Sequence, residues 1–202
     1  TNPVDLLTSG VFAAHTVIVS NETFVKTLRA NGGHYAPAGL SSELHRKFKA
    51  GRLLNAMPLL DPSFNPNRDR YLMRSYGPEN HCAGKIYNKL HLQESMNLPM
   101  DSTVPVFFWP TRLDGERPGC RMMTNTLADI LARYREQHLQ IGFVADGDYQ
   151  TQLRALTGHL NATDRVAVCD FNDQLCRTAY AGSDFVLMPL HHDPCSLPCM
   201  IG

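Results

Sequence analysis

The feature that most constrains the fold is a regular alternation of short apolar runs and helical patterns in the second half of the chain. The runs predict strands at residues 104–109, 139–144, 165–170 and 185–188, and the helical spacing predicts helices at 119–138, 149–160 and 173–181. Strands that alternate with helices form βαβ units, and such units build a parallel sheet. We therefore expect an α/β fold with a doubly wound, Rossmann-like sheet.

The first half of the chain shows a weaker form of this pattern. Helical spacing at 5–14 and 40–48 flanks a short β-branched strand at 16–19, and residues 51–55 cross into an irregular stretch. Residues 56–67 contain three prolines and no hydrophobic period, which is typical of a linker. We expect residues 1–55 to be the tail of one Rossmann-like domain and 56–84 an interdomain crossing. Residues 85–202 would then be a second, incomplete domain of the same kind.

Composition excludes several classes of function. The 202 residues carry a formal net charge of zero, which does not predict binding to nucleic acid or to an anionic membrane surface. No apolar run approaches the length that spans a bilayer, and no basic segment opens the chain as in a signal peptide. The six cysteines are therefore interpreted as reduced thiols of a cytoplasmic protein. Neither end resembles a domain boundary, so we expect a piece of a longer protein.

Polar residues follow two of the expected strands. Arg112 follows the strand at 104–109, and His191, His192 and Asp193 follow the strand at 185–188. Ligands of open α/β sheets bind at the carboxyl ends of the strands, so we expect these residues at one edge. A planar guanidinium such as that of Arg112 suits two phosphate oxygens. The alternative is an ordinary surface arginine that pairs with Asp114 or Glu116.

The cluster of histidines and cysteines near the end of the chain also invites a metal interpretation. His191, His192, Asp193, Cys195 and Cys199 are possible ligand types, but their spacing fits no common zinc site. We therefore expect no metal, and histidines that line the binding cleft or are solvated.

Segments spread in order over nearly the whole chain resemble the bacterial glycogen synthase and plant starch synthase family. The segments are Gly10–Ser20, Gly51–Asn55, Ser63–Leu72, Lys85–Gln93, Thr111–Asp114, Ala145–Asp148 and Ala179–Gly202. The resemblance implies a GT-B fold and a retaining glucosyltransferase without a cofactor. Its partners would be a nucleotide-sugar, ADP-glucose or UDP-glucose, and an α-1,4-glucan that accepts glucose at its non-reducing end. In a plant, the location would be the plastid.

The resemblance also implies roles for single residues. Arg112 matches the family's diphosphate-binding arginine, and Asp193 stands where the family has a glutamate close to the transferred sugar. The implied donor-binding residues are Gly119, Gly147, Cys195, Ser196 and Leu197, and the implied cleft-lining residues are Arg117, His191, His192 and Tyr180. For Tyr180 we weigh a plain alternative, in which the ring packs between helix and sheet. For Asp193 the alternative is a helix N-cap.

The positions at which this chain departs from the family pattern are among those with implied roles in donor binding and catalysis. Pro118 stands in place of a lysine, Asp193 in place of the glutamate, Ser196 in place of a glycine, and the N-G-I-D turn is altered at Asn55–Pro58. Proline has neither a charge nor an N–H, so Pro118 cannot contact phosphate as the lysine would. Whether the protein is an enzyme therefore stays open, and the alternative is a degenerate domain that binds nucleotide, glucan or a partner. A dinucleotide-binding protein is disfavoured, because no G-x-G-x-x-G follows the strand at 104–109.

Overall fold

The computed structural model describes residues 5–21, 23, 38–56, 59–114, 118–189 and 197–201. The chain divides into two compact units, of which the first runs to Leu59 and the second begins at Leu60. Both units are α/β, and the strands of each are parallel. No helix of the described ranges has the combined length and apolarity needed to cross a membrane.

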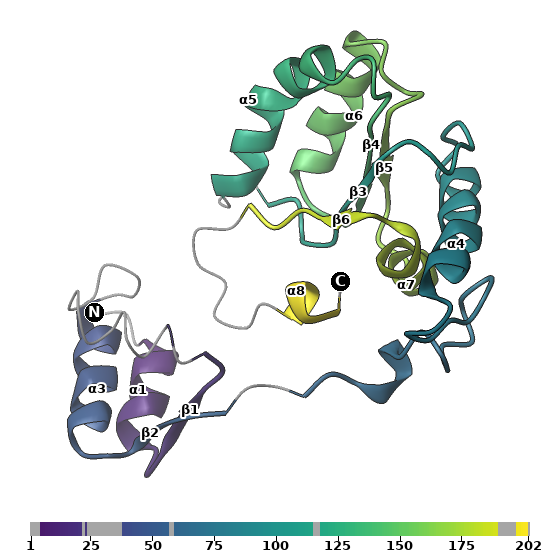
Figure 1. Ribbon diagram of the computed structural model, residues 1–202. Helices are drawn as coiled ribbons and strands as arrows, with labels where there is room; N and C mark the ends of the chain where they lie inside the picture. Colours follow the sequence, from purple (N-terminus) through teal and green to yellow (C-terminus); the bar gives the residue numbers. More distant parts are fainter. Residues whose placement is uncertain are drawn as a thin grey trace. The chain divides into compact units, whose positions relative to one another are not determined.

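The first unit contains α1 (Leu6–Ala13), β1 (Val17–Val19), α3 (Ala38–Lys49) and β2 (Leu53–Asn55) (Figure 1). Its small core consists of Val11, Leu40, Leu44 and Leu53. The buried Lys47 ends α1, because its ammonium group donates hydrogen bonds to the backbone carbonyls of Phe12 and Ala14.

One prediction for this unit is wrong. The sequence pattern predicts an irregular crossing at residues 51–55, but Leu53–Asn55 forms β2 and pairs in register with Val17–Val19. Three residues are too few to show a strand's period of two, so the pairing with β1 decides the conformation.

The second unit carries a four-stranded parallel sheet with the order β5-β4-β3-β6 (Figure 1). Its elements are η1 (Pro62–Phe64), α4 (His81–Ser95), β3 (Val106–Trp109), α5 (Pro118–Arg133), β4 (Gln140–Val144), α6 (Tyr149–His159), β5 (Val166–Cys169), α7 (Asp173–Gly182), β6 (Phe185–Val186) and α8 (Leu197–Ile201). Each of the four strands expected in this half is present, and the α/β prediction is confirmed.

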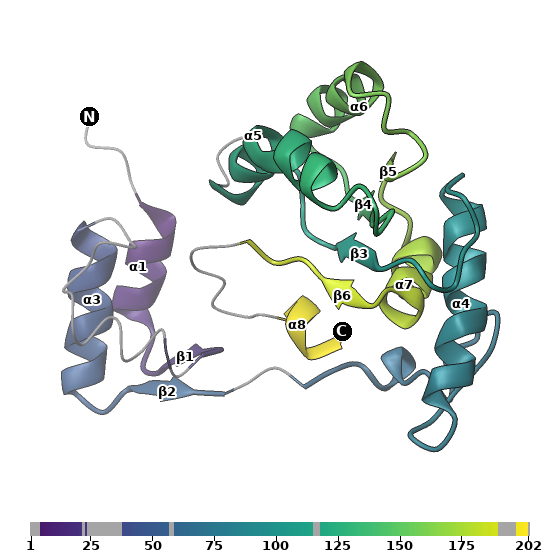
Figure 2. The same ribbon diagram turned by 45° about the horizontal axis from the view of Figure 1, so that its top comes forward.

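Helices cover both faces of this sheet (Figure 2). Side chains alternate along β3, so that Phe108 joins one core with residues of α4 and α7, whereas Trp109 joins the other with residues of α5 and α6. Strands that are buried on both faces appear in sequence as continuous apolar runs, which is why they could be predicted.

Candidate functional site

The carboxyl edge of the second sheet has the geometry of a ligand site. The chain order reverses at β3, because β4 and β5 lie on one side of it and β6 on the other. Ligands of open α/β sheets bind at such a switch point, beyond the carboxyl ends of the strands. The parallel pairing of β3 with β6 brings Arg112, which follows β3, to the same edge as Pro189, which follows β6.

Arg112 lies at this edge with an exposed side chain on a fixed backbone. The neighbouring Leu113 is fully buried; its N–H donates to the Asp146 carbonyl at 3.0 Å, and its carbonyl accepts from the Tyr149 N–H at 3.0 Å. The guanidinium of Arg112 makes no ion pair with any described residue, Asp114 included; Glu116, the other partner that the alternative names, lies outside the described residues. An exposed guanidinium on an anchored loop can donate two parallel N–H bonds to an anion.

Gly147 packs the turn between β4 and α6 against the segment that carries Arg112. Its φ of +152° is a conformation that residues with side chains rarely adopt. A Cβ at this position would lie only 2.2 Å from the carbonyl oxygen of Leu113. In this structure Gly147 therefore supports the Arg112 segment through its backbone.

Gly119 lies buried in the first turn of α5, directly after the Pro118 that replaces the family lysine. A Cβ at Gly119 would lie 2.2 Å from the carbonyl oxygen of Pro189. The start of α5 and the segment after β6 are therefore in direct contact at the switch point.

Phe171 lies at the same edge, beside Asp146 of the Ala145–Asp148 segment, and was not singled out from the sequence. The Asp146 carboxylate accepts a hydrogen bond from the Phe171 N–H at 2.9 Å, and the Phe171 side chain is 55% exposed. Beside them, Arg154 donates to Asp170 at 2.7 Å, and this hydrogen bond lowers the pKa of the Asp170 carboxyl. The signal that could have identified Phe171 is a large aromatic residue directly after a buried strand.

Tyr180 is a packing residue in this structure. Its ring meets that of Phe108 edge-on, with the centroids 5.0 Å apart, and burial raises the pKa of its hydroxyl. This geometry supports the packing interpretation of Tyr180 over a role in lining the cleft. Leu197 begins the five-residue helix α8 and is half-buried.

The remaining candidates lie outside the described residues. They are Arg117, His191, His192, Asp193, Cys195 and Ser196. Among the residues that the structure does describe, no group of three or more metal-ligating side chains comes together. The metal interpretation of the His191–Cys199 cluster is therefore untested.

The opposite, amino edge of the sheet holds motif residues in a hydrogen-bonded network, in which Lys89 is buried and Asp184 is partly exposed. The Lys89 ammonium lies 2.8 Å from the Asp184 carboxylate and 3.1 Å from the Ser102 carbonyl, and Asp184 also accepts from the Val106 N–H at 2.7 Å. These bonds join α4 to the starts of β3 and β6. The charges of Lys89 and Asp184 compensate each other, as a buried cation requires.

Gln93, in the same motif of α4, completes this network. It is fully buried; its amide nitrogen donates to the Asp101 carbonyl and the Gln140 side chain, each at 2.9 Å, and its oxygen accepts from the Asp101 N–H at 2.9 Å. Lys89 and Gln93 of this motif, together with Asp184 after α7, therefore stabilise the scaffold at the amino edge.

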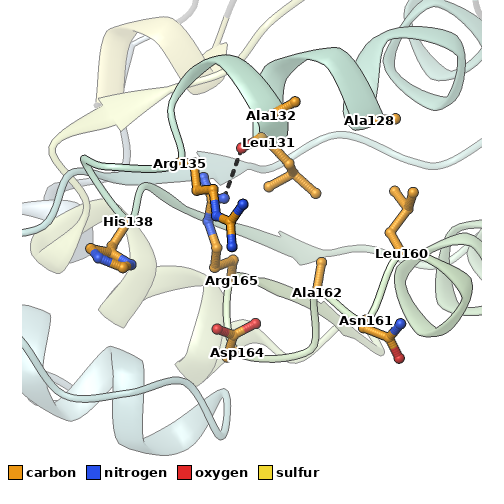
Figure 3. A pocket seen from close by; sticks show the side chains of 10 residues that line it. All are labelled: Ala128, Leu131, Ala132, Arg135, His138, Leu160, Asn161, Ala162, Asp164 and Arg165. Carbon is orange, nitrogen blue, oxygen red and sulfur yellow. Dashed lines mark hydrogen bonds between the residues drawn. The ribbon is translucent and has the colours of Figure 1, made fainter.

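A pocket of about 480 Å³ also lies at the amino edge, between the ends of α5 and α6 (Figure 3). Its central cation, Arg165, donates to three backbone carbonyls: Leu131 at 2.8 Å, Tyr134 at 2.9 Å and Leu139 at 3.1 Å. Arg165 thus ends α5, so the helix predicted to reach residue 138 stops at Arg133. Because the guanidinium is used by helix carbonyls, we assign no ligand to this pocket.

Comparisons with known proteins point to one family. No protein-family model matches the chain. A glycogen synthase of Syntrophotalea carbinolica is 30% identical over 201 residues, which cover 98% of this chain and 39% of that protein. A glycogen synthase of Alkaliphilus metalliredigens is 33% identical over 165 residues, which cover 81% of this chain and 33% of that protein.

A solved structure shows the same fold. The catalytic domain of starch synthase IV from Arabidopsis thaliana, bound to ADP and acarbose, matches with a TM-score of 0.79 at 22% identity, covering 96% of this chain and 38% of that one. The architecture is thus part of a GT-B fold. The chain belongs to the glycogen and starch synthase family, and it spans about two fifths of the length of these relatives.

Proposed function

We propose that the second unit is the nucleotide-sugar-binding part of a glucosyltransferase. The donor would be ADP-glucose or UDP-glucose, and the acceptor the non-reducing end of an α-1,4-glucan. The observation that carries this proposal is the exposed Arg112 guanidinium on its anchored loop at the switch point of the sheet. Relatives named glycogen synthase, and a starch synthase domain solved with ADP and acarbose, support it.

Arg112 would bind the diphosphate of the donor. Two parallel N–H···O bonds from one guanidinium fix a phosphate in both position and orientation. Negative charge develops on the leaving nucleoside diphosphate, so a fixed cation there also stabilises the transition state. Asp193 would act at the transferred sugar, and the backbone amides of Cys195, Ser196 and Leu197 would bind the donor.

Phe171 would hold the nucleobase. The ring is exposed at the carboxyl end of β5, and Asp146 fixes its backbone. Stacking of a base on an aromatic ring contributes about 1–3 kcal/mol and tolerates different bases. This chemistry accommodates both ADP-glucose and UDP-glucose.

The alternative is a degenerate family member that binds nucleotide, glucan or a partner without catalysis. Pro118 favours it, because the structure has proline at the first position of α5, where the family has a lysine. A cation lost beside the leaving diphosphate lowers the rate more than it lowers nucleotide affinity.

Calorimetric titration of ADP and of UDP into the chain tests the proposal. Arg112→Ala should weaken nucleotide binding tenfold to more than a hundredfold, which corresponds to about 1.5–3 kcal/mol. Arg133→Ala, which removes an exposed arginine at the far end of α5, is the matched control and should bind as wild type does. Wild type that binds neither nucleotide contradicts the proposal. Equal binding by Arg112→Ala would show that the phosphate site lies elsewhere.

A second set of measurements tests whether this chain carries a functional donor site. This chain alone should transfer no radiolabelled glucose from ADP-glucose or UDP-glucose to glycogen, because it spans only about two fifths of its relatives and transfer needs both substrates in one site. Pro118→Lys restores a cation at the start of α5 and should raise ADP affinity. If wild type binds no ADP and Pro118→Lys gains none, the donor site is inactive.

A further inference from the structure

A close backbone contact joins the two flanks of the switch point. Gly119 lies in the first turn of α5, and an added Cβ would lie 2.2 Å from the carbonyl oxygen and 3.2 Å from the Cγ of Pro189. Both ribbon views show the segment after β6 running towards the start of α5 (Figures 1 and 2). No side chain fits in this space, so the contact requires glycine.

The contact links two parts of the proposed donor site that come from different strands. α5 follows the loop that carries Arg112, whereas Pro189 is the last described residue before His191, His192 and Asp193. The spacing between the start of α5 and the end of the segment after β6 therefore depends on how closely Gly119 and Pro189 approach.

We infer that Gly119 is a positioning residue of the donor site, which sets the distance between the start of α5 and the segment that follows β6. The inference rests on the proposed function. It gives Gly119 a role distinct from direct donor binding, because the glycine acts through the carbonyl of Pro189. A methyl group at Gly119 would push the two flanks apart by about 1 Å, and a misplacement of that size costs on the order of 100-fold in rate.

The test uses Gly119→Ala with two matched controls. Gly158→Ala adds a methyl group in α6, where no atom lies within 4 Å, and should change nothing but stability. Val166→Ala removes core packing in β5 and lowers the melting temperature without touching the switch point. ADP affinity, measured by calorimetry below each melting temperature, should fall at least tenfold in Gly119→Ala and stay unchanged in both controls. A merely structural role would give Gly119→Ala and Val166→Ala the same ADP affinity.

Hydrogen exchange of the ligand-free chain separates this inference from the proposed function. Gly119→Ala should speed exchange in residues 118–123 and 185–189 and leave 140–144 unchanged, whether or not wild type binds ADP. Failure of wild type to bind ADP would therefore contradict the donor site but not the contact. Unchanged exchange in both segments overturns the inference.

A wild-type measurement covers the case in which Gly119→Ala does not fold. In urea below the global transition, residues 118–123 and 185–189 should lose protection together, because one contact holds both. Loss of protection at clearly different urea concentrations overturns the inference.

Discussion

The two ends of the second sheet use their polar residues in opposite ways. At the amino edge, the polar side chains hydrogen-bond to other parts of the protein: Lys89 and Gln93 are buried, and the partly exposed Asp184 bonds to Lys89 and to the Val106 N–H. At the carboxyl edge, Arg112 and Phe171 are exposed, and what fixes them is their backbone. Both edges carry segments that resemble the synthase family, so resemblance alone does not separate scaffold from site.

The difference indicates which substitutions should affect stability and which should affect binding. Removing a buried partner leaves unpaired donors and acceptors, which costs free energy of unfolding. Removing an exposed side chain from an anchored backbone leaves folding almost unchanged, and at the carboxyl edge it would remove a contact of the proposed donor site. The substitutions considered next test this division.

Gly147→Ala should have the largest effect. The residue lies at the carboxyl edge, yet its substitution should lower stability, so it is an exception to the rule that substitutions at this edge affect binding. The φ of +152° imposes backbone strain, and the new Cβ meets the Leu113 carbonyl at 2.2 Å. Strain and overpacking each cost about 1–3 kcal/mol, so we expect a loss of about 4 kcal/mol in the free energy of unfolding. Urea denaturation measures it, with Gly158→Ala as the control. A loss below about 1 kcal/mol would contradict the described turn.

Gln93→Leu should have the next largest effect, at the amino edge. The leucine leaves the Asp101 N–H and carbonyl and the Gln140 side-chain oxygen without their partner, so we expect a loss of about 3 kcal/mol. The control is Gln152→Leu on the exposed surface of α6, which should stay within about 0.5 kcal/mol of wild type. Nucleotide affinity below the melting temperature should not change. A Gln93→Leu variant as stable as wild type would show that the network is not formed.

The sequence predicts the parallel sheet well because its strands are buried on both faces. The apolar runs at Val106–Trp109 and Ile141–Val144 are local signals, and the placement of Arg112 after the first of them follows from the same pattern. The contact between Lys89 and Asp184 joins residues 95 positions apart, so no local pattern contains it. Phe171 was missed for a related reason: its place beside Asp146 depends on how β4 and β5 pair.

Asp146→Ala should lower stability less than Gln93→Leu does. At the carboxyl edge it should affect nucleotide binding more than folding. The substitution leaves the Phe171 N–H without its acceptor, but this exposed N–H can bond to water, so we expect a loss of about 1 kcal/mol in stability. The Phe171 ring then loses its fixed position, and affinity for ADP should fall several-fold. Asp148→Ala, one turn position away and also exposed, is the comparison variant. If Asp146→Ala binds ADP as tightly as wild type does, Phe171 is not the nucleobase platform.

The last prediction concerns the alkylation rates of the cysteines. It tests burial in the unmodified chain, without any substitution. Cys176 belongs to α7 and packs into the core, and burial raises the pKa of its thiol to about 11. At pH 8 its thiolate fraction is therefore on the order of 0.001, and labelling should rise about tenfold for each pH unit. The exposed Cys82 and Cys199 should be alkylated first.

Mass spectrometry of alkylated peptides measures these rates, and the chain unfolded in urea, where all thiols are exposed, is the control. Cys169 ends β5 at the carboxyl edge, and burial raises the pKa of its thiol. ADP should slow the labelling of Cys169 and leave that of Cys82 unchanged, because nucleotide in the proposed donor site would cover only the carboxyl edge. Labelling of Cys176 as fast as Cys82 in the folded chain would contradict the core, and equal protection of Cys82 and Cys169 by ADP would contradict the division between the two edges.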